Sequence, residues 1–220
     1  AIYDFQIISK VVNSFVLNFN KTFNNYADFS ITHFPYYYIF LSFVYKIFDS
    51  FYFVKLFVLH LSLFLPWIFY KILSLRFGKQ NNLYLFYIPG ILFISSYFRS
   101  SAIWALNDNI ALIFFSLAIF FYQKAIKQKE EKKFLLFSFL NLLMLVLASY
   151  TRQYYAIFWL FFIYKFYLLS NYKRILIFYI FISLIFSLPV LNGLFFGAAY
   201  LSNTFFSVSK NLFNNTILIP

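Results

Sequence analysis

Side chains that could act as acids, bases or phosphate ligands are scarce in this chain, and most of them interrupt long apolar stretches. The 220 residues include only six carboxylates and two histidines. Two carboxylates stand together in a lysine-rich segment, and the other four are Asp4, Asp28, Asp49 and Asp108. A carboxylate at a membrane surface can act as a general base, hold a substrate hydroxyl group or pair with a cation. These four acids are therefore the first candidates for chemistry.

The segment 99–109 carries an arginine, a tryptophan and an Asn-Asp-Asn triplet between two apolar stretches. Asp108 in this setting can act as a base, bind a sugar hydroxyl or pair with Arg99. The structural alternative is a helix N-cap, in which Asn107 or Asp108 accepts hydrogen bonds from free amides at the start of the next helix. The two roles are compatible, so both remain open.

A second polar insertion, Thr151-Arg152-Gln153, also stands between two apolar stretches. The planar guanidinium of Arg152 suits a phosphate or pyrophosphate group on a lipid-linked substrate. The alternative is an arginine that extends to lipid headgroups without binding a substrate. We favour the binding role for Arg152 and its neighbour Gln153, because the charge pattern below assigns them to the face away from the cytoplasm.

The segment from Asp28 to Pro35 reads Asp-Phe-Ser-Ile-Thr-His-Phe-Pro and combines a carboxylate, an imidazole and a proline turn. The imidazole of His33 can donate a hydrogen bond to a phosphate or relay a proton. The alternative is a polar anchor at the membrane interface. We expect His33 to position a ligand or a loop more than to transfer protons.

The composition excludes a soluble domain. Hydrophobic residues make up 63% of the chain and charged residues only 11%, and the mean hydropathy is +0.77. So little charge cannot cover a globular surface in water. The net charge of +12 arises mostly from short segments between apolar stretches, which indicates a membrane protein and no nucleic-acid partner.

Thiol chemistry is also excluded, because the chain contains no cysteine and therefore forms no disulfide and no thiolate metal site. The sequence requires no cofactor and no metal. A divalent cation would need two of the carboxylates to converge in the fold.

The apolar pattern predicts an all-α, polytopic membrane bundle. Residues 1–30 have apolar positions at helical spacing, which suits a helix on the membrane interface, and 34–48 is too short to cross, which favours a re-entrant or interfacial helix. Six crossings are predicted at 51–76, 83–98, 110–122, 134–150, 155–169 and 175–191.

Basic residues determine the predicted orientation. Arginines and lysines gather after the first, third and fifth crossings, which assigns these segments to the cytoplasm and the four acids named above to the opposite face. We expect a single transmembrane domain over 1–220, with an outer-face loop at 1–50, six transmembrane helices over 51–191 and the start of a further outer loop at 192–220. We also expect a fragment of a longer chain, because the sequence begins without methionine.

Four short motifs occur in a consistent order: the Asp28–Pro35 segment, Asn107-Asp108, Arg152-Gln153, and Asn-Gly-Leu-Phe-Phe-Gly at 192–197. They resemble the D-x-x-I-T-x-x-P, T-D, R-Q and N-G-x-x-x-G motifs of the dolichyl-phosphoglucose-dependent α-1,2-glucosyltransferases of the endoplasmic reticulum. These enzymes belong to the GT-C class of membrane glycosyltransferases. The family's acid pair is represented by Asp4 alone, and the charged residues after its last motif are absent here.

The resemblance implies a hexosyltransferase that moves a sugar from a polyprenyl- or dolichyl-phosphate carrier to a lipid-linked glycan or another acceptor. It implies a multi-pass protein of the endoplasmic reticulum or of a bacterial plasma membrane, active on the face away from the cytoplasm. The expected partners are the sugar donor, the glycan or lipid-linked acceptor and membrane lipids. The departures from the motifs leave the sugar and the acceptor open.

The resemblance also suggests residue roles. Asp4 would be the catalytic base and Asp108 a second catalytic carboxylate that supports the acceptor or the base. Arg152, or alternatively Arg99, would hold the phosphate. Asp28 and His33 would shape the first outer loop, and the aromatic helix after Pro35 would border the lipid.

The rival function is a membrane transporter or flippase for a lipid-linked or anionic substrate. Transporters place their polar residues near the middle of the bilayer, whereas the acids here gather at one predicted face, which favours an enzyme. The same one-sided distribution of Asp4, Asp28 and Asp108 argues against a simple membrane scaffold.

Overall fold

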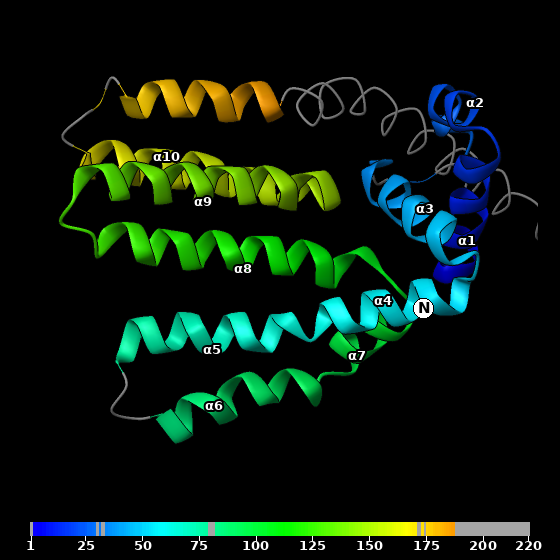
Figure 1. Ribbon diagram of the computed structural model, residues 1–220, viewed down its shortest axis with the longest axis horizontal. Helices are drawn as coiled ribbons and strands as arrows, with labels where there is room; N and C mark the ends of the chain where they lie inside the picture. The colour runs from blue at the N-terminus through cyan, green and yellow to red at the C-terminus, as the bar shows by residue number, and fades with distance from the viewer. Residues whose placement is uncertain are drawn as a thin grey trace, which may run out of the picture.

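The computed structural model describes residues 2–29, 31, 34–78, 82–170, 173 and 175–187. Within these ranges the regular structure is helical throughout and includes no strand, as the sequence predicted. Long helices run side by side, and a group of short N-terminal helices lies across one end of them (Figure 1). His33, the motif at 192–197 and the predicted outer loop 192–220 lie outside the described residues.

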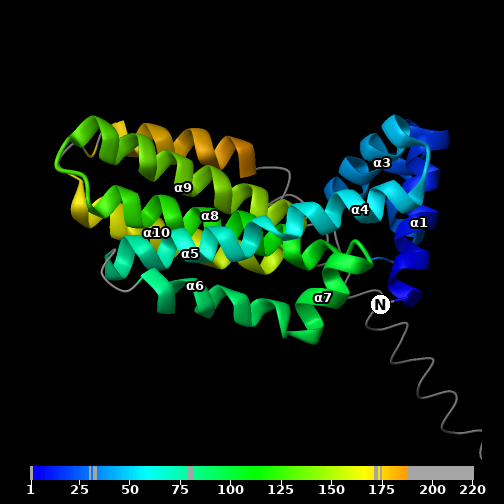
Figure 2. The same ribbon diagram turned by 60° about the horizontal axis from the view of Figure 1, so that its bottom comes forward.

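The N-terminal group contains α1 (Ile2–Leu17), α2 (Phe19–Asn24), the 3-10 helix η1 (Tyr26–Phe29) and α3 (Tyr36–Phe48). The predicted amphipathic spacing in α1 is confirmed: its buried residues recur at helical intervals and pack in one cluster with buried residues of α3 and α4. This packing connects the first helix to the end of the bundle, as the second view also shows (Figure 2).

The first predicted crossing consists of α4 (Phe51–Ser62) and α5 (Phe64–Phe77), with a break at Leu63. Pro66 explains the break, because it has no amide hydrogen to donate to the Ser62 carbonyl four residues earlier. It lies instead in the first turn of α5, where that hydrogen bond is not required. The two segments together span 27 residues, enough to cross a membrane with this bend.

The next two long helices are α8 (Asn107–Ile126) and α9 (Glu131–Thr151), which pack against each other along their length. Small side chains such as Ala118 and Ser138 are fully buried, and the Asn141 amide donates to the Ala118 carbonyl at 2.7 Å. Among the described residues, three helices are therefore long and apolar enough to cross a membrane: 51–77, α8 and α9.

The remaining predicted crossings are shorter. Residues predicted to cross at 83–98 form α6 (Asn82–Gly90), the 3-10 helix η2 (Ile91–Phe93) and the start of α7 (Ser96–Ile103). Pro89 stands within α6, and the Ser95 hydroxyl accepts from the Phe98 amide to begin α7. The other two are α10 (Ile157–Leu169), preceded by the 3-10 helix η3 (Gln153–Ala156), and the apolar helix Ile175–Ser187.

The polar segment 99–109 separates two predicted crossings, and the sequence therefore predicts a loop here. This prediction is wrong. The first residues of the segment continue α7 and its last three begin α8, which leaves only a short turn at 104–106. The error arises because polar residues at the ends of helices resemble a loop in sequence.

The chain runs back and forth through the bundle, so its connections fall at two opposite ends (Figure 1). The lysine-rich turn between α8 and α9 and the basic end of α5 lie at one end. The N-terminal helices, α7, the start of α8 and the end of α9 lie at the other. This alternation is the one that the distribution of basic residues predicted.

Candidate functional site

The centre of the candidate site is an ion pair between Asp108 and Arg152, whose Oδ1 and Nη2 atoms are 2.5 Å apart. Their side chains are only 10% and 19% exposed, respectively. The sequence singled out both residues but considered Arg99 as the partner of Asp108. The structure instead pairs Asp108 with Arg152, because the two ends of neighbouring antiparallel helices bring them together.

The backbone of this region positions the pair. Asp108 lies in the first turn of α8, and Arg152 follows the last turn of α9 in an extended conformation. The Asn107 amide donates to the Thr151 carbonyl at 3.3 Å, which links the start of α8 to the end of α9 across 44 positions of sequence. Each charge also interacts favourably with the dipole of its own helix, because the acid lies at the start of α8 and the cation lies at the end of α9.

The prediction that Asn107 or Asp108 is an N-cap is wrong. The N-cap position of α8 is Leu106, and the hydroxyl of Ser101 in α7 accepts from the Asn109 amide at 3.3 Å. A side chain from the preceding helix therefore satisfies this amide. Asn107 and Asp108 are left to bond with the end of α9.

A cavity of about 410 Å³ opens at this ion pair, and we call it the polar cavity. Its lining comes from α1, α3, α7, α8 and the end of α9. It comprises Asp4, Ile7, Ile8, Ile31, Tyr38, Tyr97, Leu106, Asn107, Asp108 and Arg152. Four of the residues selected from the sequence, Asp4, Asn107, Asp108 and Arg152, thus share one cavity although they come from three distant parts of the chain.

Two tyrosines of the polar cavity were missed by sequence reasoning. Tyr38 is one of three consecutive tyrosines in α3, and Tyr97 stands in α7 just beyond the apolar helix Tyr84–Phe93. Nothing in a chain of 20 tyrosines distinguishes these two before the fold is known.

Burial raises the pKa of Tyr38 to about 12, while the charge of Arg152 acts in the opposite direction. Tyr97 forms a side-chain hydrogen bond with Asp108. The hydroxyl groups of Tyr38 and Tyr97 can therefore both act as hydrogen-bond donors in the cavity.

Three predicted binding residues do not line the polar cavity. Arg99 lines a small, mostly apolar pocket between α4 and α7. Tyr97, two residues earlier in α7, lines the polar cavity, and residues two apart on a helix point to different sides. Asp28 lies exposed in η1, and Gln153 is half-buried at the start of η3.

Metal binding has limited support in the geometry. Within the described ranges, no group of three or more His, Cys, Asp or Glu side chains comes together. Two carboxylates, Asp4 and Asp108, line the same cavity, and the second already pairs with Arg152.

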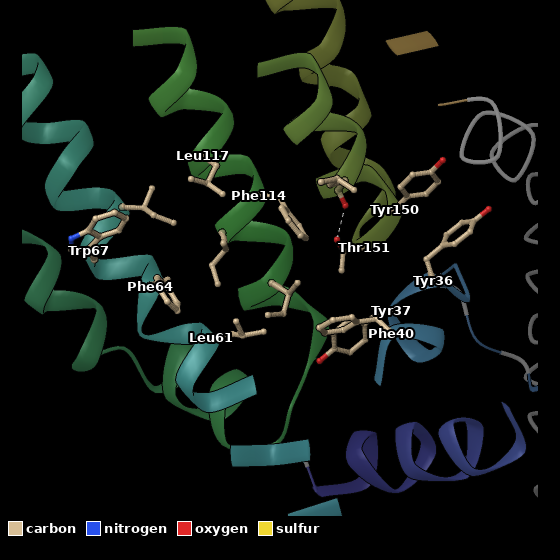
Figure 3. Close-up of a pocket in the computed structure, with 14 residues that line it drawn as sticks. Tyr36, Tyr37, Phe40, Leu61, Phe64, Trp67, Phe114, Leu117, Tyr150 and Thr151 are labelled. Carbon is tan, nitrogen blue, oxygen red and sulfur yellow. Dashed lines mark hydrogen bonds between the residues drawn. The ribbon is translucent and has the colours of Figure 1, made fainter. Parts of the chain in front are cut away.

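A second cavity of about 420 Å³ lies beside the polar cavity, and we call it the apolar groove (Figure 3). It is bordered by α3, the bend between α4 and α5, α8 and the last turns of α9. Its lining comprises Tyr36, Tyr37, Phe40, Leu61, Phe64, Trp67, Ile68, Ile110, Ile113, Phe114, Leu117, Leu147, Tyr150 and Thr151. The side chains of Trp67 and Phe40 remain 56% and 38% exposed, so the groove reaches the outer surface of the bundle.

The two cavities share three elements. Asp108 lines the polar cavity and Ile110 the apolar groove, while Arg152 and Thr151 divide in the same way at the end of α9. A molecule with a polar head and a hydrocarbon chain could therefore contact both along one path.

Comparison with protein-family models, with curated proteins and with solved structures finds no match to this chain. The assignment of a function therefore depends on the motifs and on the geometry of these two cavities.

Proposed function

We propose that this chain belongs to a GT-C-type membrane glycosyltransferase. The enzyme would transfer a sugar from a polyprenyl- or dolichyl-phosphate carrier to a lipid-linked glycan or another acceptor. The observation that carries this proposal is the polar cavity, with two carboxylates and an arginine, next to an apolar groove between the same helices. A lipid-linked sugar has matching parts: a hydrocarbon chain, a phosphate and a sugar.

Sugar transfer needs a base and a cation. The acceptor hydroxyl loses its proton as its oxygen bonds to the anomeric carbon, and the bond from that carbon to the phosphate oxygen breaks. We assign the base to Asp4, which is exposed on α1 at the rim of the cavity. Asp108 already pairs with Arg152, so we assign it the role of orienting that cation.

Arg152 would bind the phosphate that leaves. Its planar guanidinium offers hydrogen-bond donors to two phosphate oxygens at once. Developing charge on the phosphate oxygen would be stabilised by a cation that Asp108 has already oriented. The phenols of Tyr38 and Tyr97 add two neutral donors for sugar or phosphate oxygens.

The apolar groove would hold the first isoprene units of the carrier. Aromatic and aliphatic side chains form its walls, and burial of hydrocarbon contributes about 25 cal/mol per Å² of apolar surface. The exposure of Trp67 suits a chain that enters from the lipid.

The proposal includes six membrane crossings in a bacterial plasma membrane or the endoplasmic reticulum, with the polar cavity facing away from the cytoplasm. The three long apolar helices support membrane insertion. The basic turn at the opposite end of the bundle supports the orientation. Asp28 and the segment with His33 would shape the outer loop that receives the acceptor.

The second candidate is a transporter or flippase for a lipid-linked or anionic substrate, which could use the same two cavities. Transporters bind their substrates near the middle of the bilayer. Here the ion pair lies at the ends of α8 and α9, which favours chemistry at a membrane surface.

The test is sugar transfer from radiolabelled polyprenyl-phosphate hexoses in membranes that contain the full-length protein. We expect Asp4→Asn and Arg152→Ala each to lower transfer by about 100-fold or more. Asp49→Asn is the matched control for the acid, because Asp49 lies outside the cavity in a left-handed conformation that asparagine tolerates. No transfer from any donor, at normal expression, would favour the transporter.

A further inference from the structure

The turn between α7 and α8 contains a strained residue. Ala105 has a φ of 50°, and among the described residues only Asp49 is another non-glycine residue with positive φ. An L-residue with a Cβ atom disfavours this left-handed region, and alanine lacks the polar side chain that helps asparagine or aspartate to adopt it. Ala105 is also fully buried, so the surrounding packing must maintain the conformation.

Part of the support is local. The Trp104 amide donates to the Ser100 carbonyl at 3.0 Å, and the Leu106 amide donates to the Ser101 carbonyl at 2.9 Å. This pattern ends many helices, and the left-handed position is then usually glycine.

The remaining described support comes from α3. The phenol of Tyr37 donates to the Ala105 carbonyl at 2.7 Å, across 68 positions of sequence. Tyr37 is only 3% exposed, so water cannot readily replace this bond. Burial raises the pKa of Tyr37 well above its ordinary value, which keeps the phenol protonated.

The turn directly precedes the ion pair. Leu106 and Asn107 line the polar cavity, and Asn107 connects α8 to the carbonyl of Thr151. A change in the turn at Ala105 would therefore displace the first turn of α8, and with it the carboxylate of Asp108.

The ring of Tyr37 belongs to the other cavity. It lines the apolar groove, and Figure 3 shows its hydroxyl directed away from Tyr36 and Tyr150. One side chain thus lines the groove with its ring and contacts the strained turn with its hydroxyl.

We propose that Tyr37 is a positioning residue that couples the apolar groove to the Asp108–Arg152 pair. A hydrocarbon chain in the groove packs on the ring, keeps the hydroxyl on Ala105 and so holds the turn that places Asp108. The identification of the hydrocarbon as an isoprenoid chain rests on the proposed function. The coupling itself depends only on an apolar ligand in the groove.

The experiment measures amide hydrogen exchange in the α7–α8 turn of the full-length protein in lipid nanodiscs, with and without geranylgeraniol. This isoprenoid alcohol carries neither phosphate nor sugar, so a response reports on the groove alone. In the wild type we expect geranylgeraniol to slow exchange of the Leu106 and Asn109 amides by about tenfold. In Tyr37→Phe we expect faster exchange and no response to the ligand.

Two further variants sharpen the test. Ala105→Gly removes the steric cost of the left-handed turn, so Tyr37→Phe/Ala105→Gly should regain wild-type protection within about threefold but remain insensitive to geranylgeraniol. Tyr36→Phe is the matched control, because Tyr36 also lines the groove but packs against Tyr150, with ring centroids 4.5 Å apart. Its response should equal that of the wild type.

An equal response in wild type and Tyr37→Phe would overturn the proposal, and so would the absence of a response in the wild type. If Tyr37→Phe does not fold, the double variant provides the same comparison. Since the measurement involves no sugar, normal coupling without sugar transfer would reject the glycosyltransferase and retain the coupling. Normal sugar transfer without a response to geranylgeraniol would retain the glycosyltransferase and reject the coupling.

Discussion

The polar cavity and the apolar groove enclose nearly the same volume, about 410 and 420 Å³, yet only the lining of the polar cavity contains charged side chains. They lie side by side on α3, α8 and α9. On each helix, residues one or two positions apart divide between them: Tyr38 and Tyr37, Asp108 and Ile110, Arg152 and Thr151. Because successive helical residues point about 100° apart, one turn can serve two environments.

The difference shows how such a site remains stable. In the polar cavity the charges of Asp108 and Arg152 pair with each other, and the amide of Asn107 donates to the Thr151 carbonyl. The lining of the apolar groove contains no charged side chain, and in the proposed function a hydrocarbon chain would cover it. Substitutions that remove the difference in charge between the two cavities should have the largest effects on the free energy of unfolding.

The largest expected effect follows from breaking the ion pair. Arg152→Ala leaves the carboxylate of Asp108 at 10% exposure without its cation, which should cost about 3 kcal/mol in the free energy of unfolding. Thermal unfolding in detergent would measure this. The double variant Asp108→Asn/Arg152→Ala should lose less free energy of unfolding than the sum of the losses in the two single variants. Strictly additive losses would contradict a coupled pair.

A charge in the groove should have a slightly smaller effect. Ile113→Asp makes the second cavity resemble the first but provides no cation, at an expected cost of about 2.5–3 kcal/mol in the free energy of unfolding. We also expect loss of geranylgeraniol binding, measured by equilibrium binding in nanodiscs. Ile113→Leu is the control, and retained binding in Ile113→Asp would show that hydrocarbon does not occupy this groove.

Asn109, which stands between Asp108 and Ile110 in sequence, holds the start of α8 against its neighbours. Its amide donates to the Phe98 carbonyl at 3.0 Å and to the Ser62 hydroxyl at 3.2 Å, connecting α8 to α7 and α4. Asn109→Leu should cost about 1–3 kcal/mol in the free energy of unfolding, because the Phe98 carbonyl loses its side-chain donor in a buried position. Ser62→Ala removes only the longer of the two hydrogen bonds of Asn109. It should lower the free energy of unfolding by less than half as much.

The smallest effect at neutral pH is expected from Tyr38→Phe. The folded pKa of Tyr38 is raised to about 12 from an ordinary 10, so the folded state holds the phenolic proton more tightly than the unfolded state. This contribution to stability is fully present below pH 10 and is lost as the pH rises towards 12. Unfolding of both proteins between pH 8 and 12 should show a smaller decline for Tyr38→Phe, and parallel curves would contradict the shift.

Several features followed from the sequence alone. Composition and apolar periodicity predicted helices, three of which are long enough to cross a membrane, and the amphipathic packing of α1. The distribution of lysine and arginine predicted which connections share an end of the bundle. The scarcity of charge directed attention to Asp4, Asp108 and Arg152, which line one cavity. These features are local or compositional, and short-range preferences decide them.

Only the tertiary structure decided which of these residues touch. It paired Asp108 with Arg152 rather than Arg99, selected two tyrosines among many, and connected Tyr37 to Ala105 across 68 positions. It also divided the segment 99–109 between two helices. Each outcome depends on how the helices are rotated and where their ends meet. That is set by the packing of side chains distant in sequence, which no local pattern records.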